Sequence, residues 1–129
     1  MTRVQIPANT KYGDLLAYSR LVALGDEAWI AGCAPTDDSG ELVGRACPHK
    51  QTRQCIANIE RALTDAGFVL ADVVRTRLFI RSFEHAEQIM RAHREAFDSI
   101  RPASTVIAVA DLVLPEMLIY MDADARRAR

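Results

Sequence analysis

Cysteine and histidine, the residue types that most often act as metal ligands or nucleophiles, each occur three times in the 129-residue chain. Cys47 and His49 stand two positions apart and could hold a metal with Cys33 as a third ligand. Structural zinc sites, however, use four ligands in closely spaced pairs, and the chain has no CxxC pair. We therefore expect reduced thiols, no disulfide framework and no metal site.

The other chemically active side chains point to no familiar cofactor or covalent chemistry. His93 lies on an apolar helical stripe, where a histidine usually packs neutral against a hydrogen-bond partner. Lys11 and Lys50 are the only lysines, and neither stands in a segment apolar enough to desolvate a Schiff-base amine. Dinucleotide, P-loop and serine-hydrolase motifs are missing, so we expect no cofactor.

The charged residues are almost balanced, with 16 basic against 17 acidic and a net charge of −1. Such a chain has no broad field to attract a polyanion, so nucleic acid is an unlikely partner on these grounds. Arg75 and Arg77 share one strand face, and each either reaches a binding cleft or pairs with a surface carboxylate. Three further arginines close the chain after two aspartates and are expected to form a solvated tail: Arg126, Arg127 and Arg129.

Length and composition predict one globular domain over residues 1–129, because 50% of the residues are hydrophobic and 26% are charged. The segment from Met1 to Asp14 has no apolar core of a signal peptide, and no run approaches the ~20 apolar residues that cross a bilayer. We expect a cytoplasmic protein without a membrane partner.

The pattern of apolar residues predicts the elements that must position any site. Alternation and turn residues indicate strands, whereas spacing at i, i+3 and i+7 indicates helices. Ser82 is a candidate N-cap for the second helix. The predicted elements are a weak strand near Val4, a hairpin of Leu21–Leu24 with Ala28–Ala31, a long loop over Ala34–Cys47, a helix from Pro48 to Gly67, a strand over Val73–Ile80, a helix over Phe83–Asp98, and strands over Thr105–Ala110 and Leu118–Met121.

This β-β-β-α-β-α-β-β order predicts an α+β fold with one mixed sheet and both helices on one of its faces. The other face is partly apolar and needs a cover of its own. Self-association of the sheet is the simplest cover.

Three stretches together carry a family resemblance: YSRLVALGDEAWIAG, QTRQCIANIERALTDAGFVLADVVRTRLFI and RPASTVIAVADLVLPEMLIYMDADA. Their order and spacing, with the glycines Gly25, Gly32 and Gly67, resemble the Rid/YjgF (RidA-like, "endoribonuclease L-PSP") family of imine and enamine deaminases. The resemblance implies a chorismate-mutase-like fold in a homotrimer with clefts between subunits. It also implies cofactor-independent hydrolysis of 2-imino acids and their enamine tautomers to 2-keto acids and ammonia.

The resemblance also implies site residues, and two of them depart from the family pattern. The family arginine that pairs with the substrate carboxylate aligns with Ser104, and the glutamate that holds the attacking water aligns with Tyr120. A phenol that titrates near pH ~10 is a poor base at neutrality. The tyrosine at the cleft mouth is retained as Tyr18, and the glycine that lets substrate approach the backbone is retained as Gly32.

Cys33 follows Gly32 at the implied cleft wall, where it is either a nucleophile or redox sensor, or a small residue that fills the strand end. Arg77 is a candidate replacement for the missing arginine. Our catalytic candidates are therefore Tyr120, Ser104 and Cys33, and our substrate-binding candidates are Tyr18, Gly32 and Arg77.

The leading functional hypothesis is hydrolytic deamination of a small-molecule enamine or imine larger than a simple 2-imino acid, such as a ring-opened aminomuconate-like compound. One alternative is a noncatalytic trimer that binds a metabolite or a partner protein in the same clefts. Another is a ribonuclease, for which we would expect a basic groove with stacking aromatic residues. The chain has a single Trp and a net charge of −1.

Overall fold

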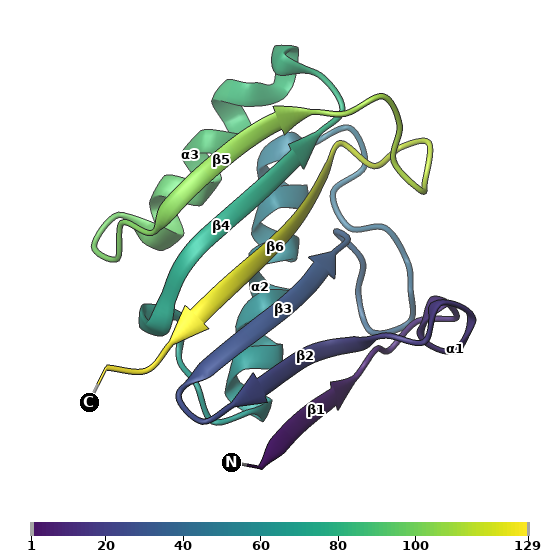
Figure 1. Ribbon diagram of the computed structural model, residues 1–129. Coiled ribbons are helices and arrows are strands. Elements are labelled where there is room, and N and C mark those ends of the chain that lie inside the picture. The colour runs from purple at the N-terminus through teal and green to yellow at the C-terminus, as the bar shows by residue number, and fades with distance from the viewer. Residues whose placement is uncertain (1, 129) are drawn as a thin grey trace.

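Alternating apolar residues build a six-stranded mixed sheet in which neighbouring strands are antiparallel, except for the parallel pair β4 and β5 (Figure 1). The structure is a computed structural model that describes residues 2–128. The order across the sheet is β1-β2-β3-β6-β4-β5. The strands are β1 (Arg3–Pro7), β2 (Ser19–Leu24), β3 (Glu27–Cys33), β4 (Val73–Ile80), β5 (Ala103–Ala108) and β6 (Ile119–Arg126).

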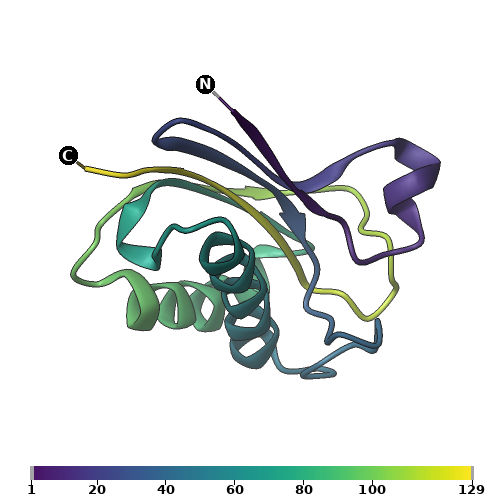
Figure 2. The ribbon, with the colours of Figure 1, turned by 90° about the horizontal axis from the view of Figure 1, so that it is seen from below.

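Two long helices cover one face of the sheet, and neither of them lies on the other face (Figure 2). We call the uncovered side the open face. The helices and 3₁₀ turns are α1 (Tyr12–Leu16), α2 (Pro48–Asp65), η1 (Leu70–Asp72), η2 (Phe83–His85) and α3 (Ala86–Phe97). Within residues 2–128, no helix is long and apolar enough to cross a membrane.

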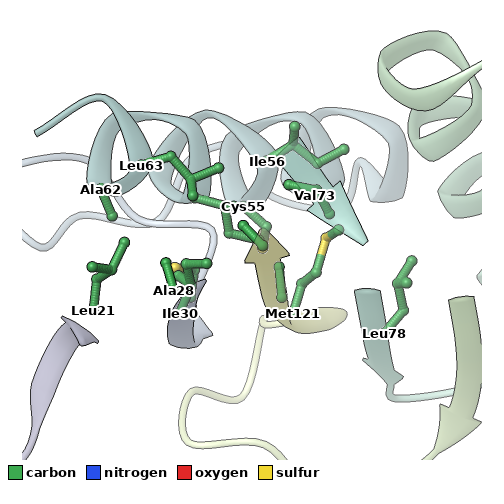
Figure 3. Packing of buried hydrophobic residues seen from close by; sticks show 14 of the residues in the cluster. Leu21, Ala28, Ile30, Cys55, Ile56, Ala62, Leu63, Val73, Leu78 and Met121 are labelled. Carbon is green, nitrogen blue, oxygen red and sulfur yellow. The ribbon is translucent and has the colours of Figure 1, made fainter. Parts of the chain in front are cut away.

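Helix α2 packs on the sheet through the predicted apolar stripe. Pro48 occupies the start of the helix, where a missing N–H costs nothing, and Ile56, Ile59 and Leu63 are buried. Figure 3 shows Leu63 pointing from α2 toward the sheet, where Leu21 lies among the core side chains. Burial of each such side chain contributes roughly 1.5–3 kcal/mol, so this layer is the main support of the sheet.

The observed elements follow one another in the predicted succession, with α1 as an addition that the pattern did not indicate. The strand predicted over Val73–Ile80 has those bounds in the structure. The second helix begins with the 3₁₀ turn η2, and the Ser82 side chain accepts a hydrogen bond from the backbone N–H of Glu84 there. One mixed sheet with helices packed on it is therefore confirmed.

The last strand and the chain end differ from the prediction. The strand was expected to stop at Met121, but β6 continues to Arg126 because Asp122 and Asp124 lie on the open face while the alternate alanines are buried. Arg127 was expected in a solvated tail, but its Nη2 donates to the carbonyl oxygen of Gly25 at 2.7 Å and its guanidinium lies 4.2 Å from the Phe68 ring centroid. Arg129 lies outside the described residues.

A buried glutamine fastens two long loops, residues 34–47 and 109–118, to the helix layer. Gln51 Nε2 donates to the carbonyl oxygens of Gly44 at 3.2 Å and Glu116 at 3.0 Å. Its Oε1 accepts from the backbone N–H of Leu118 at 2.8 Å. Because Leu118 directly precedes β6, Gln51 also sets where this strand enters the sheet.

We expect Gln51→Leu to lower the free energy of unfolding by about 2–3 kcal/mol, because it leaves backbone groups of both loops without their buried partner. Urea denaturation at fixed protein concentration measures this change. Arg53→Leu is the matched control on the exposed side of α2 and should stay within about 0.5 kcal/mol of the wild type. Equal stability of the two variants would contradict the role of Gln51 in holding the two loops.

Candidate functional site

Polar side chains meet on the open face where β2 begins, β3 ends and β6 begins, at one end of the sheet (Figure 1). Arg20 Nη1 donates to the carbonyl oxygen of Gly32 at 2.6 Å, and Arg20 Nη2 lies 3.5 Å from the Tyr18 hydroxyl. The ring of Tyr120 lies directly over Gly32. We call Tyr18, Arg20, Gly32 and Tyr120 the open-face cluster.

The contact between Gly32 and Tyr120 is so close that no side chain fits between them. A Cβ atom at Gly32 would overlap Cε2 and the hydroxyl oxygen of Tyr120. Within the chain, the Tyr120 ring takes the space above the Gly32 backbone, which was expected to admit substrate. Phe79 supports the ring from β4, with centroids 6.3 Å apart.

Tyr120 is half-buried, and its surroundings keep the phenol protonated. Burial raises the pKa of Tyr120 from its ordinary value of 10.0, with a smaller contribution from Tyr18, while the positive charge of Arg20 opposes the shift. At neutral pH the hydroxyl is therefore a hydrogen-bond donor and acceptor rather than a base. The geometry suits positioning of a water molecule or polarisation of a C=N nitrogen.

The segment around α1 brings Tyr18 to the cluster. Ala17 adopts a left-handed conformation with φ of 62°, which ends the helix and turns the chain into β2. The backbone N–H of Tyr18 then donates to the carbonyl oxygen of Gly13 at 3.1 Å. Its hydroxyl lies 3.2 Å from Oγ1 of Thr10, so Tyr18 is held from both ends.

Cys33 has the properties of a packing residue. The side chain is 1% exposed and belongs to the hydrophobic core. Burial raises the pKa of the Cys33 thiol to about 11, although Arg20 opposes the shift. A thiol that stays protonated at neutral pH is a weak nucleophile, which argues for the strand-end filler rather than the catalytic candidate.

Two of the side chains considered for metal binding, His49 and Cys33, are engaged elsewhere in the fold. His49 Nε2 lies 2.6 Å from Oε1 of Glu95, which joins α2 to α3. Cys33 is enclosed in the core, away from solvent. In the part of the chain that the structure describes, no three His, Cys, Asp or Glu side chains gather as metal ligands would.

Ser104 lies on the other side of the sheet from Tyr120. Its hydroxyl is 2.6 Å from Oγ1 of Thr76, which is itself 2.9 Å from Nε2 of His93 on α3. Thr76 is fully buried beneath the helices, so Ser104 points toward the helix layer. Within one chain, the two catalytic candidates Ser104 and Tyr120 are therefore not brought together. Burial lowers the pKa of His93, which packs neutral as its position predicted.

Of its two expected roles, Arg77 has the second, which is pairing with a surface carboxylate. It makes two hydrogen bonds of 2.9 Å to the carboxylate of Asp122, and this pairing raises the pKa of Arg77. The arginine that does join the cluster is Arg20, which the sequence reasoning missed. A signal was present, because residues two apart on a strand share a face and Arg20 stands two positions after Tyr18.

A double-mutant cycle tests the contact between Gly32 and Tyr120. Gly32→Ala should lower the free energy of unfolding by about 1–3 kcal/mol, because the added methyl group displaces the ring. In the Tyr120→Ala background the same change should cost less than about 1 kcal/mol, since the clash has gone. Urea denaturation of all four proteins measures the difference, and an equal cost in both backgrounds would contradict the contact.

Comparison with known proteins agrees with this architecture. A sequence family described as "Endoribonuclease L-PSP" matches residues 10–127. An uncharacterized protein of Streptomyces coelicolor is 27% identical over 124 residues, which cover 95% of this chain and 91% of the relative. The 3-aminoacrylate deaminase RutC of Acinetobacter baylyi is 31% identical over 91 residues, which cover 70% of this chain and 71% of the relative.

A solved structure extends the likeness over nearly the whole chain. Rv2704 from Mycobacterium tuberculosis, described as a member of the YjgF/YER057c/UK114 family, superimposes with a TM-score of 0.87 at 31% identity. The alignment covers 98% of this chain and all of that protein. With a family match over residues 10–127 and a shared fold, the chain belongs to the endoribonuclease L-PSP family, the group also called Rid/YjgF.

Proposed function

We propose that the protein is a cofactor-independent hydrolytic deaminase of a reactive imine or enamine. Water adds to the carbon of the C=N bond, the nitrogen takes up protons and leaves as ammonia, and a carbonyl group remains. The observation that carries the proposal is the open-face cluster, in which two phenols and a guanidinium converge on one backbone segment. A relative named for deamination of 3-aminoacrylate supports the reaction class.

This reaction needs a positioned water, a donor to the nitrogen and an oriented carbon atom, and the cluster contains side chains suited to each need. Tyr120 is a protonated phenol in a half-buried place, where a hydrogen bond is stronger than in water. Tyr18 provides a second hydroxyl, held by Thr10. We therefore propose Tyr120 and Tyr18 as the residues that contact the reacting atoms.

We further propose that the substrate is larger than a simple 2-imino acid, for example a ring-opened aminomuconate-like compound. Position 104 holds a serine whose hydroxyl bonds Thr76, so this position supplies no guanidinium to a small carboxylate. The open face around Tyr120 and Phe79 offers aromatic surface to a longer carbon skeleton.

We propose that three chains associate through their open faces in a chorismate-mutase-like homotrimer, so that each cluster lies in a cleft between subunits. Trp29 is 42% exposed and Ile107 is 46% exposed, and both lie on strands of the sheet, whose open face is not covered by the two long helices. Apolar side chains of this size favour a partner surface. A second subunit would also exclude water from the cluster, which strengthens its hydrogen bonds.

The deaminase proposal predicts that the protein accelerates ammonia release from imines generated enzymatically in the assay. Tyr120→Phe should lower the rate about tenfold or more, because it removes the hydroxyl and keeps the ring. Ser104→Ala should lower it less, because that hydroxyl faces Thr76. Tyr12→Phe is the matched control, a tyrosine on α1 outside the cluster, and should keep the wild-type rate.

The rates decide between catalysis and binding alone. Ammonia release at the uncatalysed background rate in the wild type and all variants would refute the deaminase proposal. Such a result, together with tight binding of a metabolite, would favour the noncatalytic trimer. Cleavage of RNA by the wild type would favour the ribonuclease named in the family description.

The trimer proposal predicts a mass near three times the 14.3 kDa chain in sedimentation experiments. Trp29→Lys should weaken association, because it places a charge in the interface. The variant chain should still fold, because Asp124 in the facing position of β6 can pair with the new lysine. Ala57→Lys adds the same charge to exposed α2 and should leave the trimer intact. A monomeric wild type would contradict the proposal.

A further inference from the structure

Within residues 2–128, Arg20 differs from the other half-buried arginines in having no acidic partner. Three arginines among these residues are neither fully exposed nor buried: Arg20, Arg81 and Arg127. Arg81 pairs with Asp111 at 3.3 Å, and Arg127 pairs with Asp26 at 3.6 Å. Among residues 2–128, no carboxylate lies within 4.0 Å of the Arg20 guanidinium.

The acidic side chains of the open face are already engaged by other arginines. Both oxygens of Asp122 accept hydrogen bonds of 2.9 Å from Arg77, and Asp124 lies 3.8 Å from Arg75. Arginine stays charged at any physiological pH. A half-buried guanidinium without a counter-ion has lost part of its hydration without recovering it from a negative charge, so its surroundings favour an incoming anion.

The contacts of Arg20 fix its position without using its capacity for an anion. Nη1 donates to the carbonyl oxygen of Gly32 at 2.6 Å and lies 3.5 Å from Sγ of Cys33, which stays protonated. The guanidinium carbon lies 5.8 Å from the Tyr18 ring centroid. A guanidinium has five N–H donors in a planar fork, so a carboxylate can still receive hydrogen bonds from it.

We propose that Arg20 is the specificity-determining residue of the cluster and binds a carboxylate group of the substrate. The phenols of Tyr18 and Tyr120, both near the same guanidinium, then place the C=N bond beside that anchor. This assignment rests on the proposed deaminase function for the identity of the ligand. It moves the anion contact from position 104, on the helix side, to the second residue of β2 on the open face.

Binding without turnover tests this role, with benzoate as the anionic probe and benzamide as its neutral counterpart of the same shape. NMR titration of the full-length protein should show benzoate binding about tenfold or more tightly than benzamide, the difference expected for one charge-assisted pair. Arg20→Met should abolish the preference. Arg20→Lys should keep part of it, because the lysine retains the charge but lacks the fork.

The controls separate ligand binding from a purely structural role of Arg20. Arg75→Met removes another open-face arginine, outside the cluster, and should keep the wild-type preference for benzoate. Arg20→Lys retains a donor for the Gly32 carbonyl oxygen, so it tests the site even if Arg20→Met is unstable. Urea denaturation of each variant verifies folding.

Two results would overturn the assignment: equal affinity of the wild type for benzoate and benzamide, or retention of the benzoate preference in folded Arg20→Met. Failure of the deaminase proposal looks different. In that case imine hydrolysis stays at background, while the benzoate preference and its dependence on Arg20 persist.

Discussion

The alternation of side chains along β6 is the constraint on which the rest of the structure depends. This strand lies between β3 and β4, so each of its residues faces either the helix layer or the open face. Side chains on one face complete the core beneath α2, and those on the other carry the polar groups of the site. A shift of one residue in register would exchange the two sets. The helix-side residues are Ile119, Met121, Ala123 and Ala125, and the open-face residues are Tyr120, Asp122 and Asp124.

The same alternation distributes charge over the open face. The two aspartates of β6 lie opposite the two arginines of β4, so these four charges are largely neutralised in pairs. Arg20 approaches from β2 on the other side of β6, where Tyr120 rather than an acid is its neighbour. The site is therefore positive beside a neutral patch, although the whole chain carries a net charge of −1. Local charge, rather than net charge, decides what such a surface attracts.

Much of the fold could be predicted from the sequence, because each strand or helix is encoded by residues close together in the chain. The regular alternation in Val73–Ile80 gave the correct bounds. The prediction ended β6 too early because it took Asp122 and Asp124 as signs of a tail. Their place in a strand depends on arginines about 50 residues earlier, which no local pattern contains.

The site was less predictable than the fold for the same reason. Tyr18, Gly32 and Tyr120 were identified by resemblance and do come together in the structure. The resemblance predicted Ser104 at the same site. In the structure, the parallel register of β4 and β5 pairs Ser104 with Thr76 instead. The strand-face pattern pointed to Arg75 and Arg77 on β4, whereas the same spacing at the start of β2, where Arg20 stands two positions after Tyr18, was not recognised.

The packing of Tyr120 against Gly32 also constrains which pairs of residues these two positions can hold. A large ring at position 120 fits only above a residue without a Cβ atom, whereas a glycine at position 32 tolerates any neighbour. The glycine is therefore a requirement for the tyrosine, and it can be replaced at low cost only when the ring is absent. Of the two residues, the one without a side chain is the one that makes room for the other.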